Sequence, residues 1–151
     1  REFLKSDSYS SKLAKVVNTK GELQPAFLAI WVWADYLTKN LNDKKHLILD
    51  GTPRKLNEAH VLDGAFSFYK RSNVNVIYIN VSEDWATNRL KDRQRSDDTD
   101  AGIKKRLDWF DTETIEAIDF YKNNSNYNFF DINGEQSIEE VHNQIVQNLE
   151  K

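Results

Sequence analysis

The chain has 151 residues, of which 39% are hydrophobic and 30% charged, and it carries a net charge of −3 with a pI near 5.6. These values predict one soluble globular domain, and the acidic balance argues against a general attraction to nucleic-acid backbone or anionic membranes. The absence of cysteine excludes disulfides, thiol catalysis and thiolate metal sites. No apolar run reaches transmembrane length, and no signal peptide is visible. The three histidines, His46, His60 and His142, are too far apart in the sequence to have the spacing of metal ligands.

The first forty residues predict two helices of different character. Residues 1–19 are helical and polar with few apolar positions, and Gly21 breaks that segment. Pro25 is tolerated in a first helical turn and opens a helix over residues 26–40. This second helix is expected to be largely buried, and its two tryptophans are interpreted as core residues. Its apolar positions are Phe27, Ile30, Trp31, Val32, Trp33 and Leu37.

Strands and helices alternate in the rest of the chain. His46–Asp50 is a short apolar run that predicts a buried strand, and residues 51–54 turn after it. Runs rich in β-branched and aromatic residues predict two more strands, over 74–81 and 127–132. Helical spacing of apolar residues predicts helices over 56–69, 83–93 and 99–123, and a capping box of Ser137 and Glu140 starts a last one.

This alternation predicts an α/β fold with a parallel sheet covered on both faces, because the strands are apolar nearly throughout. Ligands of such sheets bind beyond the carboxyl ends of the strands. Asp50, Gly51 and Arg54 follow one such end, and Asn133 and Gly134 follow the last strand. These five residues are therefore candidates for a binding site.

Arginines are concentrated between residues 89 and 107. Arg89 and Arg93 lie four apart, so a helix places them on one face. Guanidinium groups bind phosphate oxygens bidentately and stay charged at any working pH. A solvated, salt-bridged helix face is the alternative, but a local basic cluster on an acidic protein suits a small polyphosphate. The other members of the cluster are Arg95, Asp97, Asp98 and Arg106.

Four motifs in chain order resemble those of the adenylate kinase family. Asp50–Arg54, Asp-Gly-Thr-Pro-Arg, resembles the family's Asp-Gly-Phe-Pro-Arg signature, and the arginine cluster resembles the segment that flanks the lid. Gly21–Pro25 resembles the loop along the acceptor base, and Asn133–Gln136 sits where the family places a loop against the donor adenine. Because all four fall in order and at family spacing over essentially the whole chain, the sequence is similar to a nucleoside monophosphate kinase of this family.

The resemblance implies a three-layer α/β/α fold of the P-loop NTPase type around a central parallel sheet. It implies a single domain over residues 1–151, in which 1–25 complete the acceptor-binding helices, 26–151 form the core and 93–98 form a minimal lid. The implied reaction is reversible transfer of the ATP γ-phosphoryl group to AMP, giving ADP, with Mg²⁺, in the cytoplasm and without nucleic acid or membrane. Phosphoryl transfer needs positioning and charge neutralisation, so arginines and a metal suffice.

Individual roles also follow from the resemblance. The expected catalytic residues are Arg54, Arg89, Arg95 and Arg106. The expected acceptor-binding residues are Arg1, Glu22, Leu23, Gln24, Gly51, Arg54, Glu58, Arg95 and Arg106. The expected ATP-binding residues are Arg89, Arg93, Gly134 and Gln136. Asp97 and Asp98 are expected to brace the lid and orient the arginines, and Asp50 to hold magnesium through water.

The largest departure from the family is the absence of Gly-x-x-x-x-Gly-Lys-Ser/Thr, the loop that cradles donor phosphates with backbone N–H groups and a lysine. Roughly 35 residues of the usual fold, including a central strand, are not in the sequence. Since the chain starts at Arg1 and contains no methionine, we expect a fragment that is catalytically dead or nearly so. The intact family is monomeric, but the gap left by a central strand could promote dimerisation or domain swapping.

Three smaller departures concern the lid and the acceptor. Only Gln94 separates Arg93 from Arg95, which resembles a trimmed short lid, and nothing accounts for Thr52 in place of Phe. Glu58 stands where adenylate kinases commonly have Gln. A Gln amide can donate to adenine N1 and accept from N6, whereas an ionised Glu only accepts, which would suit cytosine or guanine. Glu58 pointing into solvent is an equally weighted alternative.

Other functions stay open on the sequence alone. AMP is the expected acceptor, with CMP, UMP or GMP as alternatives. A non-catalytic nucleotide-binding or scaffold domain is a rival, and so is a P-loop kinase of another small metabolite, which the combined signature and lid motifs disfavour. A nucleic-acid-binding module is disfavoured because the basic cluster is short and lacks interleaved aromatics.

Overall fold

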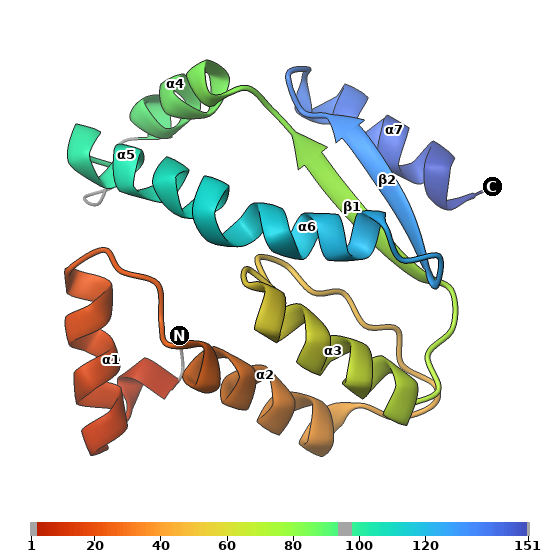
Figure 1. Ribbon diagram of the computed structural model, residues 1–151, viewed down its shortest axis with the longest axis horizontal. Coiled ribbons are helices and arrows are strands. Elements are labelled where there is room, and N and C mark those ends of the chain that lie inside the picture. The colour runs from red at the N-terminus through yellow and green to blue at the C-terminus, as the bar shows by residue number, and fades with distance from the viewer. Residues whose placement is uncertain (1–2, 94–97, 151) are drawn as a thin grey trace.

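The computed structural model describes residues 3–93 and 98–150, and a parallel pair of strands forms its sheet (Figure 1). β1 (Val74–Asn80) pairs with β2 (Tyr127–Asn133) along the full length of both strands, from Val74 opposite Tyr127 to Asn80 opposite Asn133. Because the strands are parallel, the loops that follow them meet at one edge. The predicted α/β class with a parallel sheet is confirmed.

The N-terminal part is helical, as predicted. A 3₁₀ turn, η1 (Phe3–Lys5), leads to α1 (Tyr9–Thr19), whose N-cap Ser8 accepts a hydrogen bond from the N–H of Ser11 at 3.2 Å. α2 (Ala26–Asn40) begins directly after Pro25, which confirms the predicted bounds.

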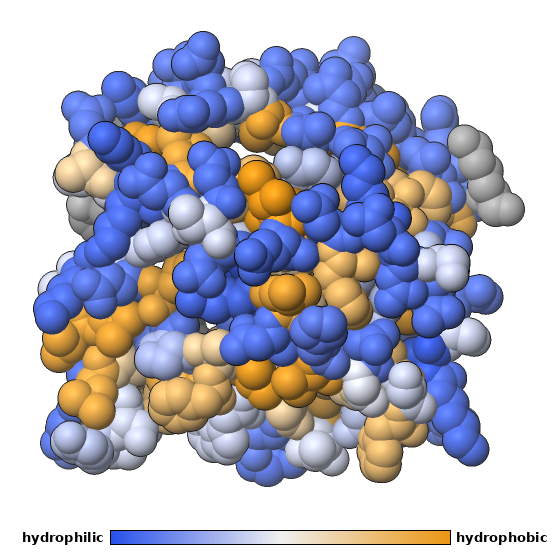
Figure 2. Space-filling model, viewed as in Figure 1, coloured by the Kyte–Doolittle hydropathy of each residue, from blue (hydrophilic) through white to orange (hydrophobic). Residues whose placement is uncertain are grey.

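α2 is more exposed than predicted. Only Leu28 and Leu37 of this helix are buried, whereas Phe27 is 73% and Trp31 50% exposed. In Figure 2, apolar side chains reach the surface over the lower part of the face, where α1 and α2 lie. The expectation that α2 is largely buried, with both tryptophans in the core, is therefore wrong, because this part of the chain packs α2 on one side only.

The strand predicted over His46–Asp50 does not form. These residues are irregular, and Ile48, expected in the core, is 90% exposed. A strand exists only when a neighbour takes up its hydrogen bonds, and within the described residues β1 and β2 pair only with each other. An apolar run alone therefore did not suffice to make a strand here.

The remaining helices follow the predictions. α3 (Leu56–Phe68) precedes β1, α4 (Glu83–Arg93) follows it, and α7 (Ile138–Leu149) starts at the predicted capping box. The predicted helix over 99–123 is found as α5 (Asp100–Trp109), a π-helical turn η2 (Phe110–Thr114) and α6 (Ile115–Lys122). Thr99 caps α5 by accepting from the N–H of Gly102 at 3.1 Å. Within the described residues, no helix combines the length and the apolarity that crossing a membrane requires.

The core lies where α3 and α6 pack on one face of the sheet. Ala59 of α3 and Ala117 of α6 are fully buried, and their small side chains let the two helices approach each other closely. Tyr121 and Tyr127 complete this cluster, and α7 contacts β2 (Figure 1). The core thus fixes the start of α3, which carries the site described next.

Candidate functional site

A cavity of about 350 Å³ lies between η1, α1, α2 and the start of α3. Its size suits a small organic ligand, and most of its wall is apolar, with Leu4, Leu28 and Val32 among the lining residues. Five residues predicted to bind an acceptor nucleotide line it together: Leu23, Gln24, Gly51, Arg54 and Glu58. The fold thus brings together two loops that lie about thirty residues apart in the chain.

The loop before α3 is folded tightly around Gly51. This glycine has a φ of +69°, and a Cβ there would lie 3.1 Å from Nη2 of Arg54. The Nε of Arg54 donates to the carbonyl oxygen of Gly51 at 2.8 Å. The turn therefore holds the base of the Arg54 guanidinium at the cavity wall and leaves its other nitrogens available for an anion.

Glu58 belongs to the cavity wall. It is only 4% exposed, and its Oε2 accepts a hydrogen bond from the backbone N–H of Arg54 at 2.9 Å. No residue in the described part of the chain donates to its other oxygen, Oε1. The alternative that Glu58 points into solvent is therefore wrong.

Two further polar atoms at this wall are buried without a hydrogen-bond partner among the described residues. Gln24 donates from Nε2 to the carbonyl of Ala14 at 2.9 Å and to Oδ1 of Asn18 at 2.7 Å, but its Oε1 accepts nothing. Nε1 of Trp33 donates to nothing. Sequence reasoning missed Trp33, because its place on α2 gave only an apolar signal.

The arginine cluster is organised by Asp98. Its side chain is 1% exposed and accepts from Nε of Arg93 at 3.0 Å, from Nη2 of Arg93 at 2.7 Å and from Nη1 of Arg106 at 2.6 Å. Arg89 lies over the ring of Trp85 at 5.9 Å. The structure thus brings Arg93, Asp98 and Arg106 together. The predicted site residues Arg1, Arg95 and Asp97 and most of the predicted lid lie outside the described residues.

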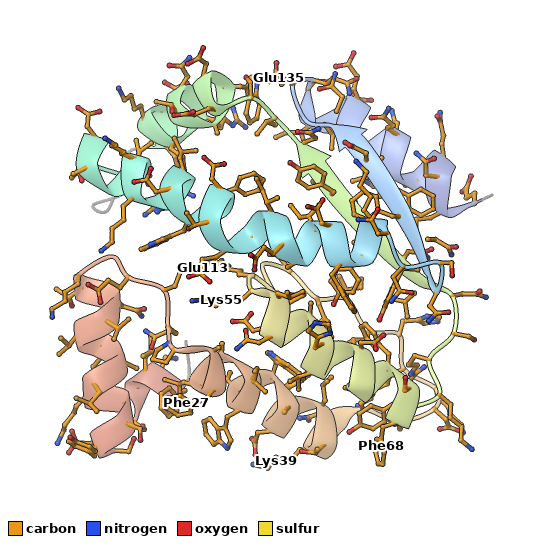
Figure 3. The ribbon with its side chains drawn as sticks, in the orientation of Figure 1. Phe27, Lys39, Lys55, Phe68, Glu113 and Glu135 are labelled. Carbon is orange, nitrogen blue, oxygen red and sulfur yellow. The ribbon has the colours of Figure 1, made fainter. Side chains whose placement is uncertain are left out.

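The loops beyond the carboxyl ends of β1 and β2 are joined to each other. Gly134 donates to the carbonyl of Asn80 at 2.7 Å, and Glu135 accepts from the N–H of Ser82 at 2.6 Å (Figure 3). Hydrogen bonding by the Ser82 side chain and then by its N–H lowers the pKa of Glu135. Nε2 of Gln136 donates to the carbonyl of Asn133 at 2.7 Å. These hydrogen bonds hold Gly134 to the end of β1 and Gln136 to the end of β2. The bridging Glu135 was missed because it depends on a partner 53 residues away.

Two lysines connect the segments around the cavity to α5 and to η2, which continues α5. Lys55, at the start of α3, pairs with Glu113 of η2 at 3.1 Å, and Figure 3 shows these side chains pointing toward one another. Lys105 of α5 lies 3.7 Å from Glu22 and donates to the carbonyl of Lys20 at 3.4 Å. Glu22, predicted to bind the acceptor, pairs with this lysine and is not among the residues that line the cavity, so its acceptor role stays a prediction.

Asp50 is the predicted magnesium residue, and it is exposed just before Gly51. No group of three or more histidines or carboxylates able to hold a metal occurs among residues 3–93 and 98–150. A single exposed carboxylate fits Mg²⁺, which keeps several waters and binds through one or two carboxylates plus substrate phosphates. The residues present therefore fit a water-mediated magnesium site that needs phosphate to complete it.

Comparisons with known proteins agree with this geometry. A profile of the family described as adenylate kinase matches residues 1–126. The adenylate kinase of Prochlorococcus marinus (strain MIT 9515) is 31% identical over 150 residues, 99% of this chain and 79% of that protein. The adenylate kinase of Oenococcus oeni (strain ATCC BAA-331 / PSU-1) is 33% identical over 99 residues, 66% of this chain and 53% of that protein. Adenylate kinase isoenzyme 5 of Homo sapiens is 30% identical over 145 residues, 93% of this chain and 25% of that protein.

The family profile over residues 1–126 and the alignment with the Prochlorococcus marinus protein over 150 residues include both loops of the cavity and the arginine cluster. The resemblance stated from the four sequence motifs is thereby confirmed. The chain belongs to the adenylate kinase family, whose members are phosphotransferases.

Proposed function

We propose that the protein transfers a phosphoryl group reversibly between ATP and a nucleoside monophosphate, with AMP as the acceptor that gives ADP. The observation that carries this proposal is the cavity that gathers Leu23, Gln24, Arg54 and Glu58. Lys105 ties the neighbouring loop to α5, which bears Arg106, and Lys55 ties the start of α3 to η2. The proposal includes a single domain over residues 1–151 and a cytoplasmic location without nucleic-acid or membrane partners.

In this mechanism the protein supplies positioning and charge, since phosphoryl transfer requires little covalent chemistry from side chains. Arg54 would hold the acceptor phosphate at the mouth of the cavity. Arg106, aligned by Asp98, would neutralise charge on the phosphoryl group that moves. Arg93, held by the same carboxylate, would face the phosphates of ATP. Contacts with ATP are also proposed for Arg89, Gly134 and Gln136. The roles expected from the sequence are kept as proposals for three residues outside the described ranges: Arg1, Arg95 and Asp97. Mg²⁺, held through water by Asp50, would neutralise phosphate charge when bound.

We further propose that these 151 residues alone turn over little or nothing, because they contain no Gly-x-x-x-x-Gly-Lys loop to cradle the donor phosphates. A coupled assay with ATP·Mg²⁺ and AMP tests this, run on the chain with and without a supplied segment that carries such a loop. Full turnover by the chain alone would refute the idea.

The acceptor is tested by offering AMP, CMP, UMP and GMP to the protein as encoded. Turnover with AMP far above the rest is expected. Preferred turnover of CMP or GMP would keep the reaction and change the acceptor. Absence of turnover with all four, in a protein that carries the donor loop, would instead support a non-catalytic nucleotide-binding domain.

A further inference from the structure

Glu135 is a charged residue of the loop after β2 to which the proposed reaction gives no role. Its carboxylate accepts a hydrogen bond from the N–H of Ser82 at 2.6 Å, and Figure 3 shows Glu135 between this loop and α4. The loop has two other anchors, because Gly134 is bonded to the end of β1 and Gln136 to the end of β2. The contact therefore adds more to Ser82, which directly precedes α4, than to the loop.

Two further contacts lead from Ser82 along α4 to Arg89. Oγ of Ser82 accepts from the backbone N–H of Trp85 at 3.3 Å, as the side chain of an N-cap residue does. Arg89 comes four residues after Trp85 and so lies on the same face of the helix, with its guanidinium over the Trp85 ring at 5.9 Å. Glu135 is thus connected to Arg89 through Ser82 and one aromatic ring.

Arg89 depends on this series of contacts more than the other arginines do. Arg93 and Arg106 are held by the buried carboxylate of Asp98. No residue in the described part of the chain forms an ion pair with Arg89. A long exposed side chain loses rotamer freedom when a ligand orders it, and this loss weakens binding. A guanidinium that already lies on a ring has less freedom to lose.

We propose that Glu135 is a positioning residue that orients Arg89 for ATP, a role that rests on the proposed function. The carboxylate fixes the start of α4, the start of α4 fixes the ring of Trp85, and the ring presents the Arg89 guanidinium to the nucleotide. The loop after β2 and α4 are thereby held in one arrangement before ATP arrives, which lowers the free-energy cost of binding. The acceptor cavity is lined by other elements, so AMP binding should not depend on Glu135.

The test is calorimetric titration of the protein as encoded with the β,γ-imido analogue of ATP and Mg²⁺, and separately with AMP. Glu135→Ala should weaken binding of the analogue about three- to tenfold and binding of AMP by less than about twofold. Glu135→Gln keeps an oxygen that accepts from Ser82, so both affinities should stay within about twofold of wild type. Glu139→Ala, which removes an exposed carboxylate from the first turn of α7, is the matched control and should leave both affinities unchanged.

A double substitution shows whether Glu135 acts through Arg89. In an Arg89→Ala background, Glu135→Ala should weaken binding of the analogue by less than about twofold, because the group that it orients is gone.

Three results would overturn this role. Glu135→Ala could leave the affinity for the analogue unchanged, it could weaken the analogue and AMP equally, as a general loss of structure would, or it could have the same effect in the Arg89→Ala protein as in wild type. Each of them leaves the proposed function standing if wild-type protein binds both nucleotides. A wild-type protein that does not bind the analogue would refute the proposed transfer from ATP and this role together.

Discussion

Asp98 shows how one residue sets the geometry of a cluster. Its buried carboxylate binds Arg93 with two parallel hydrogen bonds and Arg106 with a third. Bidentate, charge-assisted contacts fix the planes of the guanidiniums as well as their positions. The sequence indicated that the arginines and the carboxylates belong together. It could not indicate which carboxylate binds which arginine, because that choice depends on how α4 and α5 pack.

Asp98→Asn tests this role, since it keeps the shape and removes the charge. We expect the free energy of unfolding to fall by about 1–3 kcal/mol, less than for a fully buried pair, because water screens the partly exposed guanidiniums. Urea denaturation measures the change. Asp100→Asn, in an exposed pair with Lys91, is the control and should cost less than about 0.5 kcal/mol. Equal effects of the two substitutions would show that Asp98 is no more than a surface partner.

Gly134 is a second residue whose side chain, or lack of one, decides the local structure. A Cβ at this position would lie 2.6 Å from Cγ2 of Ile79 and 2.6 Å from Cγ1 of Val81. Gly134→Ala should therefore lower the free energy of unfolding by about 1–3 kcal/mol through overpacking. Gly64→Ala, in α3 with open space around it, should instead raise it by about 0.5–1 kcal/mol. Thermal unfolding of both variants measures these two changes. A Gly134→Ala protein as stable as wild type would contradict the close approach of Ile79 and Val81 to Gly134.

At the scale of elements, local sequence signals predicted the helices correctly. They gave a wrong prediction for a strand, because a strand forms only beside a partner that is distant in the sequence. Pro25 and the apolar spacing that follows it gave the bounds of α2, because both act within one turn of the helix. The run His46–Asp50 carries the same kind of local signal, but a strand requires a neighbour, and the described chain offers it none. The residues of the candidate site show the same difference between local and distant signals. Loop motifs predicted Arg54 and Glu58, whereas Trp33 needed the packing of α2 against α3.

The capping box at the start of α7 was predicted from the sequence and is confirmed, and its contribution to stability can be tested. Oγ of Ser137 accepts from the N–H of Glu140 at 3.2 Å, and the Glu140 carboxylate accepts from the Ser137 hydroxyl at 2.6 Å and its N–H at 2.9 Å. Ser137→Ala should lower the free energy of unfolding at neutral pH by about 1 kcal/mol. Urea denaturation measures this, with exposed Glu139→Gln as a control that should change it by only a few tenths of a kcal/mol.

The same cap predicts a dependence on pH. The Ser137 side chain and then its N–H lower the pKa of Glu140 from its ordinary 4.5. A lowered pKa in the folded state means that this stabilisation is present above pH 4.5 and is lost as the pH falls through the folded-state pKa. The difference in the free energy of unfolding between wild type and Ser137→Ala should therefore become smaller at acid pH. A gap that stays constant down to pH values well below 4.5 would refute the role of the carboxylate.

At the scale of the whole molecule, a buried polar group joins three elements of the core. The hydroxyl of Tyr127 on β2 donates to Oδ1 of Asp63 on α3, and Tyr121 of α6 packs edge-on against Tyr127 at 4.7 Å between ring centroids. Burial, followed by the hydrogen bond to Asp63, raises the pKa of Tyr127. Burial, followed by the negative charge of Asp63, also raises the pKa of Tyr121. This contact ties α3, whose first turn lines the cavity, to the beginning of β2.

This contact should make the molecule sensitive to alkali. Below pH 10, the ordinary pKa of tyrosine, both phenols are neutral in the folded and the unfolded chain, so their stabilisation is complete. Above it the unfolded chain releases protons that the folded chain retains, and the free energy of unfolding falls as the pH rises toward the folded-state pKa values. Tyr127→Phe should cost about 1–2 kcal/mol at neutral pH, because Asp63 loses its donor, and should make the alkaline loss shallower. Urea denaturation between pH 7 and pH 11, beside the exposed Tyr36→Phe control, measures both effects, and alkaline curves of equal slope would contradict the role of Tyr127.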